Sequence, residues 1–325
     1  MINSKNYHYL HRLAKRTVPI FHKKDRFDQI MNREKNGEAN QLISEMIKSG
    51  KPFVAGRLGS TESCFLVNQL LQKTINSDLS GIIQTATGKI NVLWKEDPLY
   101  MTELCTVSGF FPNDNSLADK FVDIYNQCIP NVDILGVWNK MEYQLHDLIP
   151  KDAYLCKIRE LEPWFYENPW SYELKGKKVL LVHHFEDSIK YQFTQKDLLY
   201  KNPKTLPDFE LKTIKAVMTI TGENPEFETW FDALDSMKEQ IANTDFDIAI
   251  IGCAAYGLPL ASFVKYLGKQ AIHLGGVTQL LFGIKGKRWE EWQHYTDLRK
   301  NNGENWIFAN EIPEDYKKIE GGCYW

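Results

Sequence analysis

The fold is decided by the stretch Phe246–Trp289, which reads FDIAIIGCAAYGLPLASFVKYLGKQAIHLGGVTQLLFGIKGKRW. It opens with a short apolar run that stops at Gly252, a pattern typical of a buried strand in a parallel sheet. Beyond it we expect a helix, a second strand, a glycine turn and a second helix, at about 258–267, 270–274, 275–276 and 277–282. Two consecutive strand–glycine–helix units predict an α/β fold, a doubly wound and mostly parallel sheet with helices on both faces.

Polar residues stand where these units turn. Tyr256 lies in the first turn, His273 near the end of the second strand, and Gln279 one turn into the next helix. Open parallel sheets bind ligands at their carboxyl edge, and the N–H groups of a helix start favour an anion. Three cations in the run 285–288 suit a phosphate or a diphosphate. A solvated basic loop explains those cations equally well.

Length and composition bound the class of protein. The chain has 325 residues without a linker or a repeat, so we expect a single domain over 36–325 that follows a basic arm over 1–35. A net charge of −3 argues against nucleic acid as a partner. Six cysteines without a metal-ligand spacing indicate reduced thiols in a cytoplasmic protein. No secretory segment and no long apolar span appears.

Two features hint at surfaces that bind something. The first 26 residues hold seven cations and one acid, interleaved with apolar residues. Such an arm suits peripheral contact with the anionic inner face of a plasma membrane, and an arm docked on the protein is the alternative. Trp164 and Trp170 lie in a proline-rich, aromatic loop. Their indole faces would stack on a sugar, although core packing is the default for any single tryptophan.

Two further strand ends carry polar groups. The strand expected at 52–55 leads into Gly56-Arg57-Leu58-Gly59-Ser60-Thr61-Glu62, where Ser60 would cap the next helix and Glu62 would lie in its first turn. The strand expected at 178–182 leads into His183-His184-Phe-Glu-Asp187-Ser188. We also expect strands at 132–137, 153–156 and 211–220, and helices at 37–49, 98–107, 116–127, 140–148 and 224–241.

Together these strand ends resemble the bacterial GT-D-type glycosyltransferases and related surface-polysaccharide biosynthesis proteins. The resemblance covers the chain from about residue 35 onward, and its most specific part is the block YGLPLA…GKQAIHLGG…QLLFGIKGKRW. It implies a single Rossmann-like domain that moves a sugar, a hexose, from a UDP-sugar to a glycan or lipid-linked glycan acceptor in capsule or O-antigen assembly. Other glycosyltransferases and the inner membrane are the further partners expected.

The resemblance also assigns residues to roles. Glu62, Asp187 and His184 are candidate catalytic groups, with Glu162 as a rival base, and Trp164 and Trp170 would hold sugar or acceptor. The donor would be bound by Arg57, Gly59, Ser60, Ser188, Tyr256, Gly257, His273, Gly275, Gly276, Gln279, Lys287 and Arg288.

One position departs from the family. Its Asp-x-Glu pair, which works with a divalent metal, reads Ser60-x-Glu62 here. Losing one carboxylate weakens a site for a hard cation, so Mn²⁺ or Mg²⁺ at Glu62 is left open. Arg57, Lys287, Arg288 and helix starts would instead stabilise the departing diphosphate. The same departure motivates an alternative, a catalytically inactive nucleotide-sugar-binding or scaffold subunit. A Rossmann oxidoreductase is disfavoured because no strand precedes a Gly-x-Gly-x-x-Gly motif.

Overall fold

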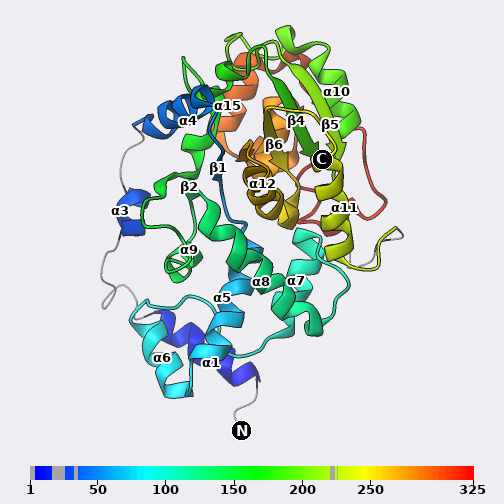
Figure 1. Cartoon of the computed structure of the whole chain (residues 1–325). Helices are drawn as coiled ribbons and strands as arrows, with labels where there is room; N and C mark the ends of the chain where they lie inside the picture. The colour runs from blue at the N-terminus through cyan, green and yellow to red at the C-terminus, as the bar shows by residue number, and fades with distance from the viewer. Residues whose placement is uncertain (1–3, 17–25, 33–35, 220–223, 225) are drawn as a thin grey trace.

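A computed structural model describes residues 4–16, 26–32, 36–219, 224 and 226–325 (Figure 1). At its centre lies a seven-stranded sheet whose hydrogen-bonded strand pairs are all parallel, in the order β3-β2-β1-β7-β6-β4-β5. The strands are β1 Phe53–Gly56, β2 Ile134–Val137, β3 Tyr154–Lys157, β4 Lys178–His183, β5 Glu210–Lys215, β6 Ile248–Gly252 and β7 Gln270–His273. The predicted α/β class with a parallel sheet is confirmed.

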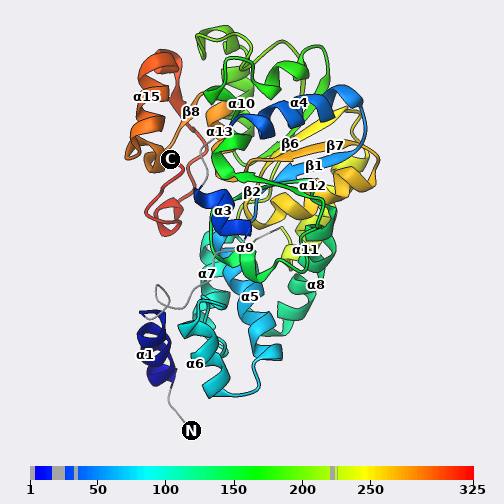
Figure 2. The same cartoon turned by 90° about the vertical axis from the view of Figure 1, so that its left-hand side faces the viewer.

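Helices cover both faces of this sheet, because its inner strands are apolar on both sides (Figures 1 and 2). One hydrophobic cluster joins the sheet to α5 Ser60–Thr74, α7 Pro98–Ser108, α8 Ala118–Cys128, α11 Trp230–Ala242 and α12 Gly257–Tyr266. A second cluster, on the other face, includes α4 Glu38–Ser49, α10 Glu186–Phe193, α13 Thr278–Leu281, α14 Lys287–Glu290 and α15 Gln293–Asn302. The sheet is therefore doubly wound, as predicted.

The strand order places a crevice between β1 and β7. These strands are neighbours in the sheet although more than 200 residues separate them in the sequence. The chain leaves β1 for α5, which packs on the first face, and leaves β7 for α13, which packs on the second. Because the two connections diverge, the carboxyl ends of β1 and β7 are left open between them. This is the position at which doubly wound proteins bind their ligands.

Several expected elements have different limits in the structure. The helix expected at 224–241 starts at Trp230, because Thr229 and Asp232 form a capping box there. The strand expected at 211–220 ends at Lys215, and residue 220 lies outside the described residues. The helix expected at 140–148 is the short α9 Met141–Gln144. The basic run 285–288 is not a loop, since it forms β8 Ile284–Lys285, paired with β9 Ile307–Phe308, and the start of α14.

The described parts of the N-terminal arm are helical and docked. Helix α1, Ser4–Lys15, packs against α6, Asp78–Ala86, and α3, Arg26–Asn32, inserts Phe27 into the first hydrophobic cluster. Residues 17–25 and 33–35 of the arm lie outside the described residues. No helix in the described ranges is both long enough and apolar enough to cross a bilayer. All six cysteines are free thiols, as expected.

Candidate functional site

A polar cleft opens at the carboxyl ends of β1 and β7. It holds about 1340 Å³ of empty space, part of it open to solvent. Nine of the residues singled out from the sequence line this cleft: Arg57, Gly59, Ser60, Glu62, Glu162, His273, Gly275, Gly276 and Arg288. They come from distant parts of the chain, and the order of the strands brings them together.

Arg57 is the central cation of the cleft. Its guanidinium lies over the ring of Trp138, with the carbon Cζ 4.5 Å from the ring centroid, and its Nε donates a long hydrogen bond of 3.4 Å to the carbonyl of Leu58. Among the described residues, no carboxylate lies within ion-pair distance of it. Burial lowers the pKa of Arg57, although an arginine stays protonated at neutral pH. A partly buried guanidinium without a protein counter-ion suits an anionic ligand.

Two glycines make room for charged side chains. Gly275 has a φ of 66°, and a Cβ placed on it would stand 3.2 Å from Cδ of Arg57. Gly59 precedes α5, and a Cβ there would stand 1.9 Å from a carboxylate oxygen of Glu62. Both glycines were predicted, from the family resemblance, to bind the donor. Their tight fit adds a second reason for glycine, since any side chain would displace Arg57 or Glu62.

Glu62 is buried in the first turn of α5 and is 6 % exposed. Desolvation raises its pKa above the usual value, while its own backbone N–H, Arg57 and Ser108 act in the opposite direction. A raised pKa brings a carboxylate closer to the range in which it works as a general base. The expected cap at Ser60 is wrong, because Gly59 is the N-cap residue and no side chain caps this helix.

Glu142 was not found from the sequence. It is fully buried, and its carboxylate accepts hydrogen bonds from Trp138 N, Asn139 N and Asn139 Nδ2 at 3.4, 2.8 and 3.1 Å. Desolvation nevertheless raises its pKa to about 8. Its role is to fix the turn after β2, and thereby Trp138 under the guanidinium of Arg57. A strand end at Trp138-Asn139 was visible in the sequence, but nothing there connected it with Arg57.

The opposite wall of the cleft is aromatic. Trp292 is 47 % exposed and stacks on Tyr295, with ring centroids 6.0 Å apart, and Arg159 lies 5.7 Å from the Trp292 ring. The hydroxyl of Tyr295 donates a hydrogen bond of 2.7 Å to Glu162, which also lines the cleft. An exposed indole face of this kind suits a sugar ring. Arg159, which follows β3, was not predicted from the sequence.

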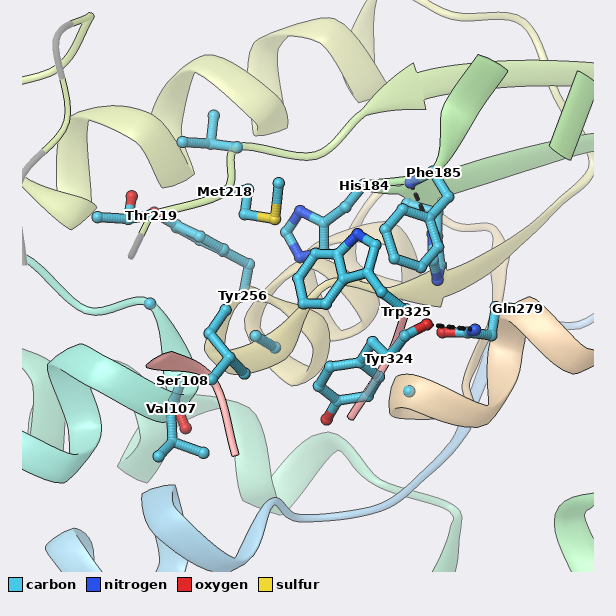
Figure 3. Close-up of a pocket in the computed structure, with 17 residues that line it drawn as sticks. Val107, Ser108, His184, Phe185, Met218, Thr219, Tyr256, Gln279, Tyr324 and Trp325 are labelled. Atoms are coloured by element: carbon cyan, nitrogen blue, oxygen red, sulfur yellow. Dashed lines mark hydrogen bonds between the residues drawn. The ribbon is translucent and has the colours of Figure 1, made fainter. Parts of the chain in front are cut away.

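A second, smaller cavity adjoins the cleft (Figure 3). It has about 590 Å³ of empty space and shares Ser108, Ala254, Gly276 and Tyr324 with the cleft. Its other walls come from the ends of β4 and β6, the segment 217–219, and the last residue, Trp325. Four residues predicted to be functional line it: His184, Tyr256, Gly276 and Gln279.

Gln279 and Tyr256 each leave a buried polar atom without a protein partner. The amide nitrogen of Gln279 donates to the carbonyls of Lys285 and Tyr324 at 2.8 and 3.0 Å, which leaves its oxygen Oε1 unpaired. The hydroxyl of Tyr256 is also unpaired, while its ring stacks on Trp230 at 4.8 Å. Desolvation lowers the pKa of His184 to about 4, so its imidazole is neutral at pH 7. Buried acceptors of this kind call for a ligand that donates hydrogen bonds.

The turn between the two compartments is strained. Ala254, which follows β6, has a φ of 47°, a left-handed conformation that non-glycine residues adopt rarely. Such a conformation costs about 1–3 kcal/mol and is typical of functional sites. The C-terminal residues dock beside this turn, since Arg288 N donates to the carbonyl of Cys323 at 2.9 Å and Trp325 Nε1 to that of Glu311 at 2.7 Å.

Other sequence-predicted site residues lie elsewhere. Trp170 is fully buried and donates its ring N–H to the carbonyl of Leu161, and Trp164 is 7 % exposed, so the expectation that they stack on sugar is wrong. The backbone N–H groups of Asp187 and Ser188 bind Glu311, and neither residue lines the cleft or the smaller cavity. Asp187 and Ser188 therefore lie outside the candidate site.

Two more donor-site assignments fail for a geometric reason. Lys287 is exposed outside the cleft, because the α14 start turns its neighbour Arg288 inward instead. There Arg288 pairs with Glu320 and donates to the hydroxyl of Tyr324 at 3.2 Å. Gly257 packs against the ring of His273, where a Cβ would stand 2.0 Å from Cε1. Its function is close packing and not ligand contact.

A metal site was left open by the sequence. Within the described part of the chain, no three His, Cys, Asp or Glu side chains are grouped so as to hold an ion. With Ser60 beside it, Glu62 offers fewer protein oxygens than Mn²⁺ or Mg²⁺ takes from a dedicated site. The residues present do not form such a site by themselves.

Comparison with protein-family models, with curated proteins and with solved structures found no match for this chain.

Proposed function

We propose that this protein is a glycosyltransferase that moves a sugar, a hexose, from a UDP-sugar to a growing bacterial surface glycan. The reaction breaks the bond between the anomeric carbon and the diphosphate oxygen, and forms a bond from that carbon to an acceptor hydroxyl. UDP leaves with the bonding electron pair, and the acceptor proton goes to a base. The sequence resemblance to GT-D-type enzymes motivates the class of reaction.

Arg57 carries the proposal. It is an arginine without an ion-pair partner among the described residues, held over Trp138 at the switch point of the sheet. Negative charge builds up on the diphosphate as the bond to the sugar breaks, and a preorganised cation stabilises that charge. Arg159 and Arg288 line the same cleft and add to its positive potential.

Glu62 is the proposed base. It lines the cleft with Arg57, it is buried, and its pKa is raised by desolvation. An ionised Glu62 accepts the proton of the acceptor hydroxyl and becomes neutral, which its desolvated position favours. Glu162 remains a rival, because it lines the same cleft and is hydrogen-bonded to Tyr295.

The two compartments divide the donor between them. The uracil base fits the smaller cavity, where its N3–H would donate to the unpaired Oε1 of Gln279. The diphosphate then crosses at Gly276, which both compartments share, and the sugar enters the cleft beside Trp292. Each part of the donor meets groups of matching chemistry.

The experiment that tests the proposal uses purified full-length protein and a panel of nucleotide sugars. Release of UDP from at least one UDP-sugar, with or without added acceptor glycan, is the expected result. Absence of turnover together with absence of a thermal shift for every UDP-sugar would refute it. UDP binding without turnover would instead favour the alternative of an inactive nucleotide-sugar-binding subunit.

A further inference from the structure

We propose that the outer surface of α1 and α6 docks on an anionic lipid bilayer. This inference concerns the end of the molecule that lies farthest from the sheet (Figures 1 and 2). Of the fourteen large hydrophobic side chains exposed by the described residues, four belong to the short helices α1 and α6: Tyr9, Leu13, Leu79 and Ile83. The surface is therefore richer in exposed apolar groups than the rest of the molecule.

The outer face of helix α1 exposes both apolar and positively charged side chains. Its inner face buries His11 and Ala14, and the opposite face exposes Tyr9 and Leu13, four residues apart, by 63 % and 38 %. Arg12 lies on that same outer face. Residues 4–16 contain no aspartate or glutamate, so the charge of this helix is purely positive.

Helix α6 repeats the arrangement beside it. Leu79 and Ile83, again four residues apart, are 68 % and 53 % exposed, while Gly81 on the inner face lies against the ring of Trp94. His11 of α1 contacts the same tryptophan edge-on, with ring centroids 6.0 Å apart. Because both inner faces pack on Trp94, both outer faces stay turned to solvent.

The cations of α1 are not neutralised by the carboxylates around them. Those carboxylates already hold other partners, in the pairs His8–Asp97, Lys73–Asp119 and Lys95–Asp78. None of the ion pairs between described residues includes Arg12, Lys15 or Arg16, all three of which are exposed. Aliphatic and aromatic side chains with unpaired cations on the same helix form the pattern that binds the interface of an anionic membrane. An uncharged or basic partner would leave these cations without a counter-charge.

The test is co-sedimentation of the full chain with vesicles of phosphatidylcholine alone and with added phosphatidylglycerol. We expect binding only to the anionic vesicles, weakened by salt. The double variant Arg12→Glu/Arg16→Glu should bind at least about tenfold more weakly, as should Leu79→Asp/Ile83→Asp. Matched controls are Lys151→Glu/Lys300→Glu and Leu198→Asp/Tyr266→Asp, which change equally exposed residues elsewhere and should bind like the unmodified chain.

Three results would overturn the proposal: no binding to anionic vesicles, equal binding to both kinds of vesicle, or unchanged binding by both α1 and α6 variants. Self-association in lipid-free solution that Leu79→Asp/Ile83→Asp abolishes would also overturn it, by assigning the surface to a second copy of the chain. Circular dichroism of each variant verifies folding. No nucleotide sugar is needed, so this test is independent of the proposed transferase activity.

Discussion

The cleft and the smaller cavity adjoin each other at one edge of the sheet and differ in the charge of the residues that line them. The cleft holds Arg57, Arg159 and Arg288 with Glu62, and its far wall is aromatic. The cavity is mostly apolar and holds neutral acceptors on Gln279, Tyr256 and His184. Under the proposed function, the charged residues lie in the cleft, where the reaction would build up charge. The neutral groups lie in the smaller cavity, which would only recognise the base.

Arg57→Ala gives the largest expected effect, because it removes the arginine held over Trp138 at the carboxyl end of β1, which forms no ion pair with a described residue. UDP-sugar turnover should fall about 10³-fold, as expected for losing a preorganised group that stabilises transition-state charge. Steady-state kinetics measures this. The control is Lys287→Ala, a residue next to the cleft but outside it, and its UDP-sugar turnover should equal that of the unmodified chain. An equal loss of turnover in that variant would mean that the net charge of the region matters and not the position of Arg57.

Glu62→Gln should lower kcat about 10²-fold while UDP affinity stays within about twofold, since a base acts on the acceptor and not on the nucleotide. The acidic limb of the rate–pH profile should also disappear, because rate rises with pH as Glu62 ionises. Kinetics and calorimetry with UDP separate the two effects. If Glu162→Gln rather than Glu62→Gln has this signature, the base is Glu162. Asp187→Asn serves as the matched control.

Gln279→Leu tests the cavity and should weaken UDP binding about tenfold by removing the acceptor proposed for the base, with little change in kcat. Pyrophosphate binding should not change, because the diphosphate contacts lie in the cleft. Calorimetry with UDP and with pyrophosphate measures both. Equal weakening of the two ligands would show that the cavity does not hold the base separately.

The smallest effect concerns acid stability. His184 in the cavity and His273 in the cleft both have a pKa lowered to about 4 by desolvation. Folding holds each histidine neutral, so its contribution to stability is full above pH 6.5 and is lost as pH falls toward 4, by about 2 kcal/mol for each histidine between pH 7 and pH 5. Urea unfolding of His184→Asn at pH 7 and pH 5 should show a smaller loss than the unmodified chain. An unchanged loss would contradict the buried, neutral state of His184.

The class of fold and part of the lining of the cleft could be predicted from the sequence alone. The apolar strands with glycine ends predicted the parallel sheet, because buried strands need continuous apolar runs and their turns need glycine. Arg57, Glu62 and Gly275 were found because they follow those strands closely, and chain proximity fixes their place at the sheet edge. Arg288 was found because it belongs to a run of three cations.

Only the tertiary structure decided the rest. Strand order placed β1 beside β7, and no local pattern encodes a pairing across more than 200 residues. Trp170 is buried in the core and Trp292 is exposed, although both tryptophans stand in polar, loop-like sequence. Likewise the start of α14 turned Arg288 into the cleft and Lys287 away from it. The physical reason is the same in each case: which way a side chain faces depends on packing against distant segments, and a sequence pattern records only its neighbours in the chain.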